Sequence, residues 1–540
     1  MHGRRAAYYV VGEKVGENIL SECQRPGDAK PDRVPALRFG RLFGRTQHEP
    51  DDVEGVVQKL VRLGNAMNDD KGNGKADSDI SAGYTYLGQF IAHEVTHDST
   101  GDLLTFNLQV KNLRTPEIDL DSLYGGEEGP TTRPELYRTN GFHLRTRDTL
   151  GVGDFTPTLP YDLPRGTLAG QNGNKEANAK GALLGDARND ENLAVAQTHV
   201  AFIHFHNAVA SRIREEHQDY SSTKVFALAR EEVIRHYQWV ILYDFLPQIV
   251  RADVLDCVMR HGRRWFKGGG EDGLFMPLEF SAAAFRIGHT MVRGAYDWNP
   301  LRRKDSDRNP APLLIDLFQQ TGFLKDGLDG RNSLKGDWII DWRHFFDFSP
   351  LNRYQPVEVN LSGKLDTVFD MHLNTVTGFP DEQIDKMQRA ITVRNLLRGF
   401  YLYLPTGEEA AEWMGETPLT HDELAVGPHA AALDDPDFKG KTPLWYYVLR
   451  EAELWGYNKE GKPGNRLGPV GSRIVAETLV ALIENSPISI IQDKDWRPTL
   501  GRRANDATGQ AKFEMIDLLD FANVVSPVAE RRGELYLQQP

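Results

Sequence analysis

The feature that most constrains the fold is a pair of long helical patterns near the middle of the chain. Apolar residues recur at helical spacing through 193–215 and again through 222–250. The second pattern is almost continuously apolar over 239–250, which leaves no face for water and places that segment deep in a large core. Alternating strand patterns are few and short. We therefore predict a mainly α fold with long loops and few short strands. Further helical patterns cover 278–292, 381–399, 442–455 and 469–484.

The remaining stretches suggest one main domain carrying irregular segments. Residues 1–50 are basic and contain several Gly and Pro, which predicts an extended N-terminal arm lying on a domain formed by 51–540. A polar, Gly-rich loop is expected at 69–80. The stretch 127–180 is rich in Gly, Pro, Thr and Asn and predicts a long surface excursion rather than a linker.

Charge and cysteine content exclude some classes of protein. The formal net charge of −14 argues against a nucleic-acid binder, which needs basic surface to neutralise phosphates. The two cysteines, Cys23 and Cys257, cannot form a thiolate cage, so any metal must be held by other ligands or by a prosthetic group. We expect no membrane-spanning helix, because no run approaches roughly 18 apolar residues. Without a clear signal peptide, the expected location is the cytoplasm, or outside the cell by leaderless export.

One short motif suggests a metal site. The apolar spacing around Tyr86, Phe90, His93 and His97 suits a short buried helix, and His93-Glu94-Val95-Thr96-His97 matches HExxH. In a zinc hydrolase the two histidines of this motif bind the metal and the glutamate acts as general base. The motif fixes few positions, and no third ligand is evident downstream. A zinc hydrolase therefore stands as an alternative prediction.

Five segments in a fixed order suggest a different site. The sequence resembles the animal-type haem peroxidases of the peroxidase–cyclooxygenase superfamily, in a bacterial-like form of the peroxidase branch. The resemblance implies their mainly α fold, and a chance match would need all these residues in the same order. The segments are Gly88-Gln89-Phe90-Ile91-Ala92-His93, RTPEIDLDSLYG at 114–125, GDARNDE at 185–191 before a helix with His199 and His206-Asn207, FRIGHT at 285–290, and NLLRG at 395–399 before Leu404-Pro405, with RLGPVG at 466–471 also familiar from the family.

The resemblance assigns a distal side to the haem. It implies that His93 is the base that moves the peroxide proton, a task that suits an imidazole near neutral pH. Arg188 would stabilise the charge that develops as the O–O bond breaks. Gln89 would hold water or a halide over the iron. Glu191 corresponds to a carboxylate that can form an ester with a haem methyl group.

The resemblance also assigns a proximal side. His289 would bind the haem iron, and Asn395 would hold the other nitrogen of its ring. Arg286 is expected near the cofactor, three residues before His289, where fatty-acid dioxygenases carry a radical-forming tyrosine. Arg398 would contact a haem propionate. The arginine favours a peroxidase and leaves the dioxygenase as a distant alternative.

The segment at 114–125 resembles a calcium loop. Its alternating oxygen groups suit Ca²⁺, which takes roughly six to eight oxygen ligands. Glu94 stands where the family has a shorter acid, so calcium occupancy is left open. The expected calcium ligands are Glu94, Thr115, Glu117, Asp119 and Asp121.

Two departures from the family pattern limit the expected haem chemistry. Ala92 replaces the aspartate that forms one haem ester, and Asn192 replaces a methionine that forms a sulfonium link. The haem is therefore expected to be haem b with one ester through Glu191 or none. The expected function is reduction of hydrogen peroxide, with oxidation of phenols or of halide and thiocyanate, in a response to oxidative stress. A haem-binding protein without catalysis is a remote alternative.

Overall fold

The computed structural model describes residues 39–43, 50–68, 75–97, 112, 114–115, 117–126, 129–152, 158–166, 180–267, 274–306, 309–324, 326–370, 373, 390–501 and 511–531. The helices of these residues are α2 (Val53–Ala66), α3 (Gly83–Val95), α4 (Asp121–Tyr124), α6 (Leu193–Glu216), α7 (Ser222–Val240), α8 (Leu246–Ile249), α9 (Ala252–His261), α10 (Gly288–Met291), α11 (Leu314–Gln319), α12 (Ile391–Tyr401), α13 (Gly407–Met414), α14 (His421–Leu424), α15 (Ala430–Leu433), α16 (Leu444–Trp455), α17 (Pro469–Asn485), α18 (Met515–Phe521) and α19 (Pro527–Arg531). Two π-helical turns are η4 (Ile241–Phe245) and η5 (Phe280–Ala284), and 3₁₀ turns are η1 (Gly129–Thr131), η2 (Pro134–Leu136), η3 (Ala187–Asp190), η6 (Gly327–Gly330), η7 (Gly336–Trp338), η8 (Trp342–His344), η9 (Ser349–Leu351) and η12 (Gly427–His429).

The two long helical patterns fold as predicted. Asn192 caps α6 by accepting a hydrogen bond from the Val195 N–H at 3.0 Å, and Ser221 caps α7 in the same way. α7 continues through η4 into α8, so the apolar segment forms one nearly continuous buried helix with a π-helical turn inside it. The predictions for 442–455 and 469–484 are also confirmed, by α16 and α17.

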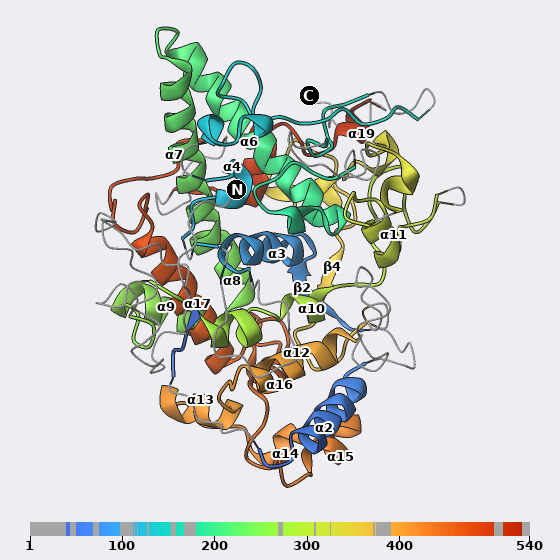
Figure 1. The fold of residues 1–540 in the computed structure, drawn as a ribbon, viewed down its shortest axis with the longest axis vertical. Coiled ribbons are helices and arrows are strands. Elements are labelled where there is room, and N and C mark those ends of the chain that lie inside the picture. Colours follow the sequence, from blue (N-terminus) through green and yellow to red (C-terminus); the bar gives the residue numbers. More distant parts are fainter. Residues whose placement is uncertain are drawn as a thin grey trace, which may run out of the picture.

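The core is centred on α3, which contacts α6 on one side and α10 on the other. Figure 1 shows α3 near the middle of the molecule, with α6 and α7 above it and α10 and α12 below. The Phe90 ring of α3 stacks on Phe202 of α6 at 4.8 Å between centroids, and Tyr237 of α7 meets both rings edge-on. This aromatic packing buries most of the surface of α3 and fixes the helix in place.

The predicted helix over 278–292 is wrong as a single helix. After η5 the Phe285 N–H bonds back to the Phe280 carbonyl, and the Arg286 N–H then bonds to Ala283, so the α-helical register is lost. A turn follows before α10 begins at Gly288. Of the predicted helix at 381–399, residues 381–389 lie outside the described residues, and α12 forms the remainder.

The described strands are short, as predicted. β1 (Phe39–Gly40) pairs in parallel with β3 (Met276–Pro277), and β2 (Asp77–Ser81) pairs antiparallel with β4 (Leu361–Gly363). β2 corrects the predicted loop at 69–80, of which 69–74 lie outside the described residues. Its side chains alternate between exposed and buried, but most are polar, which hides the strand pattern from sequence reasoning.

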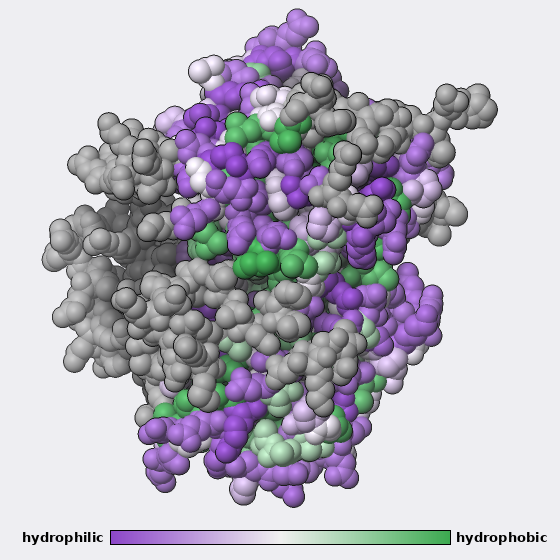
Figure 2. Space-filling model, turned by 90° about the vertical axis from the view of Figure 1, so that its right-hand side faces the viewer, coloured by the Kyte–Doolittle hydropathy of each residue, from purple (hydrophilic) through white to green (hydrophobic). Residues whose placement is uncertain are grey.

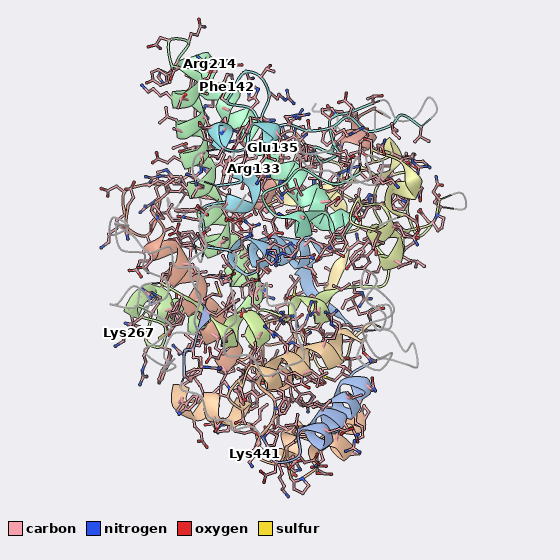
Figure 3. All side chains as sticks on the ribbon, viewed as in Figure 1. Arg133, Glu135, Phe142, Arg214, Lys267 and Lys441 are labelled. Atoms are coloured by element: carbon pink, nitrogen blue, oxygen red, sulfur yellow. The ribbon has the colours of Figure 1, made fainter. Side chains whose placement is uncertain are left out.

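The described part of the 127–180 excursion is hydrogen-bonded to α6 and packs against it. Leu144 exchanges two backbone hydrogen bonds with the Asn207 side chain, at 2.7 and 3.0 Å. The Arg214 guanidinium lies over the Phe142 ring at 5.1 Å, and Figure 3 shows this pair at the upper end of the molecule. The segment is therefore part of the main body.

The surface is largely polar. Hydrophilic side chains predominate among the coloured atoms of the face in Figure 2, and hydrophobic ones form small separate groups. Among the described residues, no helix combines the length and the apolar character needed to cross a membrane. Most of the predicted arm at 1–50 lies outside the described residues, so the domain division at residue 50 stays a prediction.

Candidate active site

The position at which α3 ends bears on whether His93 belongs to a zinc site or to a haem site. The helix stops at Val95, and Thr96 adopts an extended conformation. Asn112 completes the helix end, because its side chain donates to the Val95 carbonyl at 3.1 Å and accepts from the His97 N–H at 2.8 Å. His97 therefore lies beyond the helix and does not share a helical face with His93.

The zinc reading also lacks a set of ligands. His97 Nδ1 lies 3.7 Å from the Asp186 carboxylate, and burial lowers the pKa of His97 to about 4. The potential metal-binding group found among the described residues contains three carboxylates and no histidine. The arrangement around His93 and His97 thus offers no tetrahedral zinc site within the described part of the chain.

The 3₁₀ turn η3 carries Arg188, and Glu191 directly follows it. Asp186 caps this turn by accepting a hydrogen bond from the Arg188 N–H. The Asp186 carboxylate also binds the Arg188 guanidinium at 2.6 Å, and Arg188 Nη2 donates to the carbonyl oxygen of His93 at 2.9 Å. Burial alone would raise the pKa of Asp186, but the guanidiniums of Arg188 and Arg114 outweigh it and hold that pKa below its ordinary value.

The His93 ring is held on both of its edges. Nδ1 lies 2.9 Å from Asn189 Oδ1, and Nε2 lies 3.5 Å from the Glu191 carboxylate. Gln89, one helical turn before His93, donates to that same carboxylate and accepts from the Asn192 amide at 2.9 Å. The structure thus brings together the four residues predicted for the distal side: His93, Gln89, Arg188 and Glu191.

Glu191 is an ionised carboxylate in this arrangement. Burial raises its pKa, but the hydrogen bond and charge of His93, followed by the charge of Arg188, lower it further than burial raises it. The side chain nevertheless keeps 30% of its surface accessible, and Arg188 keeps 24%.

A second group of predicted site residues is built around His289 on α10. Its Nδ1 lies 2.9 Å from the amide nitrogen of Asn395 on α12, and Asn395 Oδ1 accepts a hydrogen bond from Arg286 at 3.1 Å. Burial, followed by the charge of Arg286, lowers the pKa of His289 to about 3, so the imidazole is neutral. The described contacts of His289 leave Nε2 for a ligand.

The two groups lie close enough for their charges to act on each other. α3 and α10 are in contact, the Glu191 charge acts on His289, and the Arg188 charge acts on Arg286. A Cβ built at Gly288 would meet no described atom within 4 Å apart from its chain neighbours and its own helix, so no other described segment packs against the backbone beside His289. A neutral imidazole whose Nε2 is left open by its described contacts suits a prosthetic group whose metal takes a histidine ligand.

Arg398 lies on the last turns of α12 and is 5% exposed. Burial lowers its pKa to about 10, and it lowers the pKa of Arg286 to about 10 as well. Both side chains therefore stay charged at neutral pH and place positive charge on the His289 side. Arg286 is engaged with Asn395 and with the Ser281 carbonyl at 3.0 Å, which makes it a support for Asn395.

An acidic cluster lies beside the His93 group. Oxygens of Glu94, Asp119 and Asp121 lie within 4.8 Å of one another. Burial, then the charges of Asp121 and Asp119, raise the pKa of Glu94 well above its ordinary value. The hydroxyl of Thr115 is buried and has no hydrogen-bond partner among the described residues. Glu117 is also described in this loop, but its place in a ligand set is not resolved.

Sequence reasoning missed the groups that position these side chains. Asn189 binds both His93 and His199, and Arg114 joins Asp121 of the acidic cluster to Asp186. The sequence offered only a local indication. Asn189 directly follows Arg188, in a segment that begins after Asp186, a good capping residue. Nothing in the sequence indicates which side chains this turn would reach.

Comparison with known structures defines the fold. Peroxidase A from Dictyostelium discoideum superposes with a TM-score of 0.57 at 16% identity, covering 85% of this chain and 91% of that one. A fatty acid alpha-dioxygenase from Oryza sativa gives a TM-score of 0.54 at 13% identity, covering 90% and 79%. The architecture is therefore the all-α peroxidase–cyclooxygenase fold.

Comparison of sequences finds a partial match to one family. The family model "Animal haem peroxidase" matches residues 96–332, which include Arg188 and His289. Dual oxidase of Drosophila melanogaster is 36% identical over 110 residues, and thyroid peroxidase of Sus scrofa is 26% identical over 224. These alignments cover 20% and 41% of this chain but only 7% and 23% of the two relatives. Residues 96–332 of this chain therefore resemble the animal haem peroxidase family.

Proposed function

We propose that this protein binds haem b between His93 and His289 and reduces hydrogen peroxide with electrons from small organic donors. The observation that carries the proposal is the pair of opposed histidines on contacting helices, each held at Nδ1 by an asparagine, at 2.9 Å in both cases. When bound there, haem would supply the iron and the electrons that cleave the peroxide O–O bond.

The His289 group would hold the cofactor. His289 Nε2 is the ligand atom, and its Nδ1 would then carry the ring proton. Asn395 Oδ1 offers an acceptor for that proton and has a second lone pair for Arg286. Arg398 provides a buried positive charge suited to a haem propionate.

The His93 group would move the proton. His93 Nε2 takes a proton from one peroxide oxygen and returns it to the other, so the leaving group departs as water. Asp186 and the His93 carbonyl engage Nε and Nη2 of Arg188. Nη1 is the atom of Arg188 that would meet developing negative charge. Gln89, which is bound to Glu191 and Asn192, would fix a water or an anion next to His93.

The proposed donors are phenols in preference to chloride. Ala92 and Asn192 cannot form the links that distort the haem in the more oxidising relatives, and Glu191 can form one ester at most. Arg286 occupies the position of the tyrosine that starts fatty-acid oxygenation. A peroxidase thus fits these residues better than a dioxygenase, although structural relatives of both kinds share the fold.

We further propose that the acidic cluster binds Ca²⁺. Glu94, Asp119 and Asp121 supply hard oxygen ligands, and a cation would provide the partner that the buried hydroxyl of Thr115 does not find among the described residues. A divalent ion would also offset the mutual repulsion of the three carboxylates. Glu117 would join through its backbone, as the family resemblance implies.

Haem binding and peroxide reactivity test the main proposal separately. The protein should bind one haem per chain and show a Soret band, and His289→Ala should lose most of the haem during gel filtration. Zinc is the competing outcome: a colourless protein that retains one zinc per chain after haem reconstitution would refute the proposal.

A further inference from the structure

The His93 ring is the first link of a buried chain of three polar side chains. His93 Nδ1 lies 2.9 Å from Asn189 Oδ1, and Asn189 Nδ2 lies 3.0 Å from His199 Nδ1. The exposed fractions of His93, Asn189 and His199 are 7%, 0% and 1%. Because water has little access to Asn189 or His199, each must satisfy its hydrogen bonds within the protein.

We propose that Asn189 and His199 are positioning residues of the candidate active site, which keep a proton on His93 Nδ1 and so hold the tautomer whose Nε2 can exchange a proton, beside the Glu191 carboxylate 3.5 Å away. The inference rests on the proposed peroxidase function, since only a base needs that tautomer. It assigns a role to two residues, one on η3 and one on α6, that reach the substrate only through His93.

The direction of the hydrogen bonds follows from the chemistry of the amide. An asparagine side chain accepts at oxygen and donates at nitrogen. With Nδ2 directed at His199, Asn189 donates to an unprotonated Nδ1 there and accepts a proton from His93 Nδ1. The reverse orientation would require a proton on His199 Nδ1 and would leave the His93 proton on Nε2. His93 could not then accept a proton from peroxide.

The same hydrogen bond suits both states of a catalytic base. His93 carries a proton on Nδ1 whether its Nε2 is free or protonated, so Asn189 Oδ1 is a suitable acceptor throughout a proton transfer. Burial lowers the pKa of His199 to about 3, so this second imidazole stays neutral and keeps a lone pair for Asn189. A charged His199 would drive the amide into the wrong orientation.

The surrounding structure prevents the chain from rearranging. Asp190, the next residue of η3, is buried in an ion pair with Arg165 at 2.7 Å and accepts from the Gly322 N–H at 3.0 Å. The edge of the His199 ring packs against Phe90 at 5.9 Å between centroids. Asn189 is therefore fixed from the turn that carries it and from the helix that it contacts.

Four variants of the haem-loaded protein test the proposal. Asn189→Leu removes both hydrogen bonds with little change in volume, and Asn189→Asp keeps the acceptor but adds a negative charge. His199→Leu removes the outer partner, whereas His199→Gln restores an acceptor for Asn189. Asn299→Leu is the matched control, because Asn299 is equally buried but binds the carbonyls of Asp337 and Ile339.

Two readouts separate orientation from stability. The first is the rate constant for reaction with hydrogen peroxide between pH 4 and 9, and the second is the affinity for cyanide, followed by the Soret shift. Cyanide binds as the neutral acid and needs a base to take its proton, so it reports on His93 without any turnover. We expect Asn189→Leu and His199→Leu to lose about 10- to 100-fold in both, comparable to other losses of an orienting partner.

The remaining variants distinguish a positioning role from a purely structural one. In Asn189→Asp the new charge should raise the pKa of His93 and move the acid limb of the peroxide profile upward by about one pH unit or more. His199→Gln should react within about threefold of the wild type, because the amide keeps its partner. Asn299→Leu should lower thermal stability and leave both readouts unchanged.

One result would overturn this inference, and a different one would refute the proposed function. Asn189→Leu with the wild-type rate, pH profile and cyanide affinity would overturn the inference, provided that the wild type reacts with peroxide. A wild type that binds haem but does not react would instead refute the proposed function. The cyanide titrations would still decide whether Asn189 orients His93.

Discussion

At the scale of single residues, the state of Glu191 leads to a covalent prediction. Its carboxylate is ionised and lies 3.5 Å from His93 Nε2, and under the proposed function it would attack an oxidised haem methyl group. We expect peroxide treatment of the haem-loaded protein to add the mass of haem to the denatured chain. Glu191→Gln should abolish this adduct because an amide is a poor nucleophile, whereas Glu94→Gln, at the neighbouring acidic cluster, should retain it. An adduct of unchanged yield in Glu191→Gln would place the link elsewhere.

The sequence predicts the reacting residues better than the residues that support them. His93, Arg188, His289 and Asn395 stand in motifs whose order alone is specific, and the structure places them in two hydrogen-bonded groups on contacting helices. Asn189 had no such signal, because its role depends on where a 3₁₀ turn meets α3 and α6. The HExxH reading failed for a similar reason: the pattern carries no information that the helix ends at Val95.

At the scale of secondary-structure elements, Asp244 links three of them. It lies in η4, accepts a hydrogen bond from the Tyr84 hydroxyl of α3 at 2.5 Å, and accepts one from the Met515 N–H of α18 at 2.7 Å. Burial raises the pKa of Asp244 to about 7, and the nearby Glu514 and Asp517 add to that rise. A carboxyl group with a raised pKa stabilises the fold most when it is protonated.

This predicts a pH-dependent loss of stability. The contribution of Asp244 should be complete below about pH 4 and lost as pH rises through about 7, at most roughly 4 kcal/mol for a shift of about three units. Asp244→Asn should therefore gain stability relative to the wild type between pH 6 and 8.5 in urea unfolding. Its amide can donate to the Tyr84 oxygen and accept from Met515. Asp305→Asn, at an exposed carboxylate, is the control. Parallel pH profiles for the wild type and Asp244→Asn would contradict the account.

The loop between Arg114 and α4 predicts a calcium effect that reaches the peroxide site. Arg114 binds Asp121 of the acidic cluster at 2.8 Å and Asp186, the partner of Arg188, at 2.7 Å. Calcium at about 100 times its Kd should stabilise the protein by about 2.7 kcal/mol. Chelation should lower the melting temperature and slow the reaction with peroxide.

Variants of the loop separate these effects. Thr115→Val should weaken binding of Tb³⁺, a luminescent calcium substitute, while Arg114→Met should uncouple the peroxide rate from calcium. An absence of both Tb³⁺ luminescence and a calcium-dependent melting temperature would remove calcium from the account.

The elements themselves divide into those with a strong local signal and those set by tertiary contacts. The long patterns that became α6, α7 and α17 are correct because their apolar periodicity is complete within each segment. The break between η5 and α10, and the polar strand β2, depend on neighbouring segments that are distant in the sequence. Their positions could not be derived from local pattern alone.

At the scale of the whole molecule, helices in contact with α3 bring the predicted site residues together. α3 carries His93 through the middle of the fold, α6 and η3 supply its partners, and α10 and α12 supply His289 and Asn395 (Figure 1). The partial family match and the fold agree with this arrangement. The central claim is that the arrangement serves to cleave peroxide.

The most direct measurement is the reaction of haem-loaded wild type and His93→Ala with hydrogen peroxide, followed by stopped-flow absorption at neutral pH. We expect the two proteins to share the same haem content, because His289 binds the iron in both. His93→Ala should react about 10²- to 10⁴-fold more slowly, the usual loss when a general base is removed. A variant that matches the wild-type rate with full haem content would contradict the account.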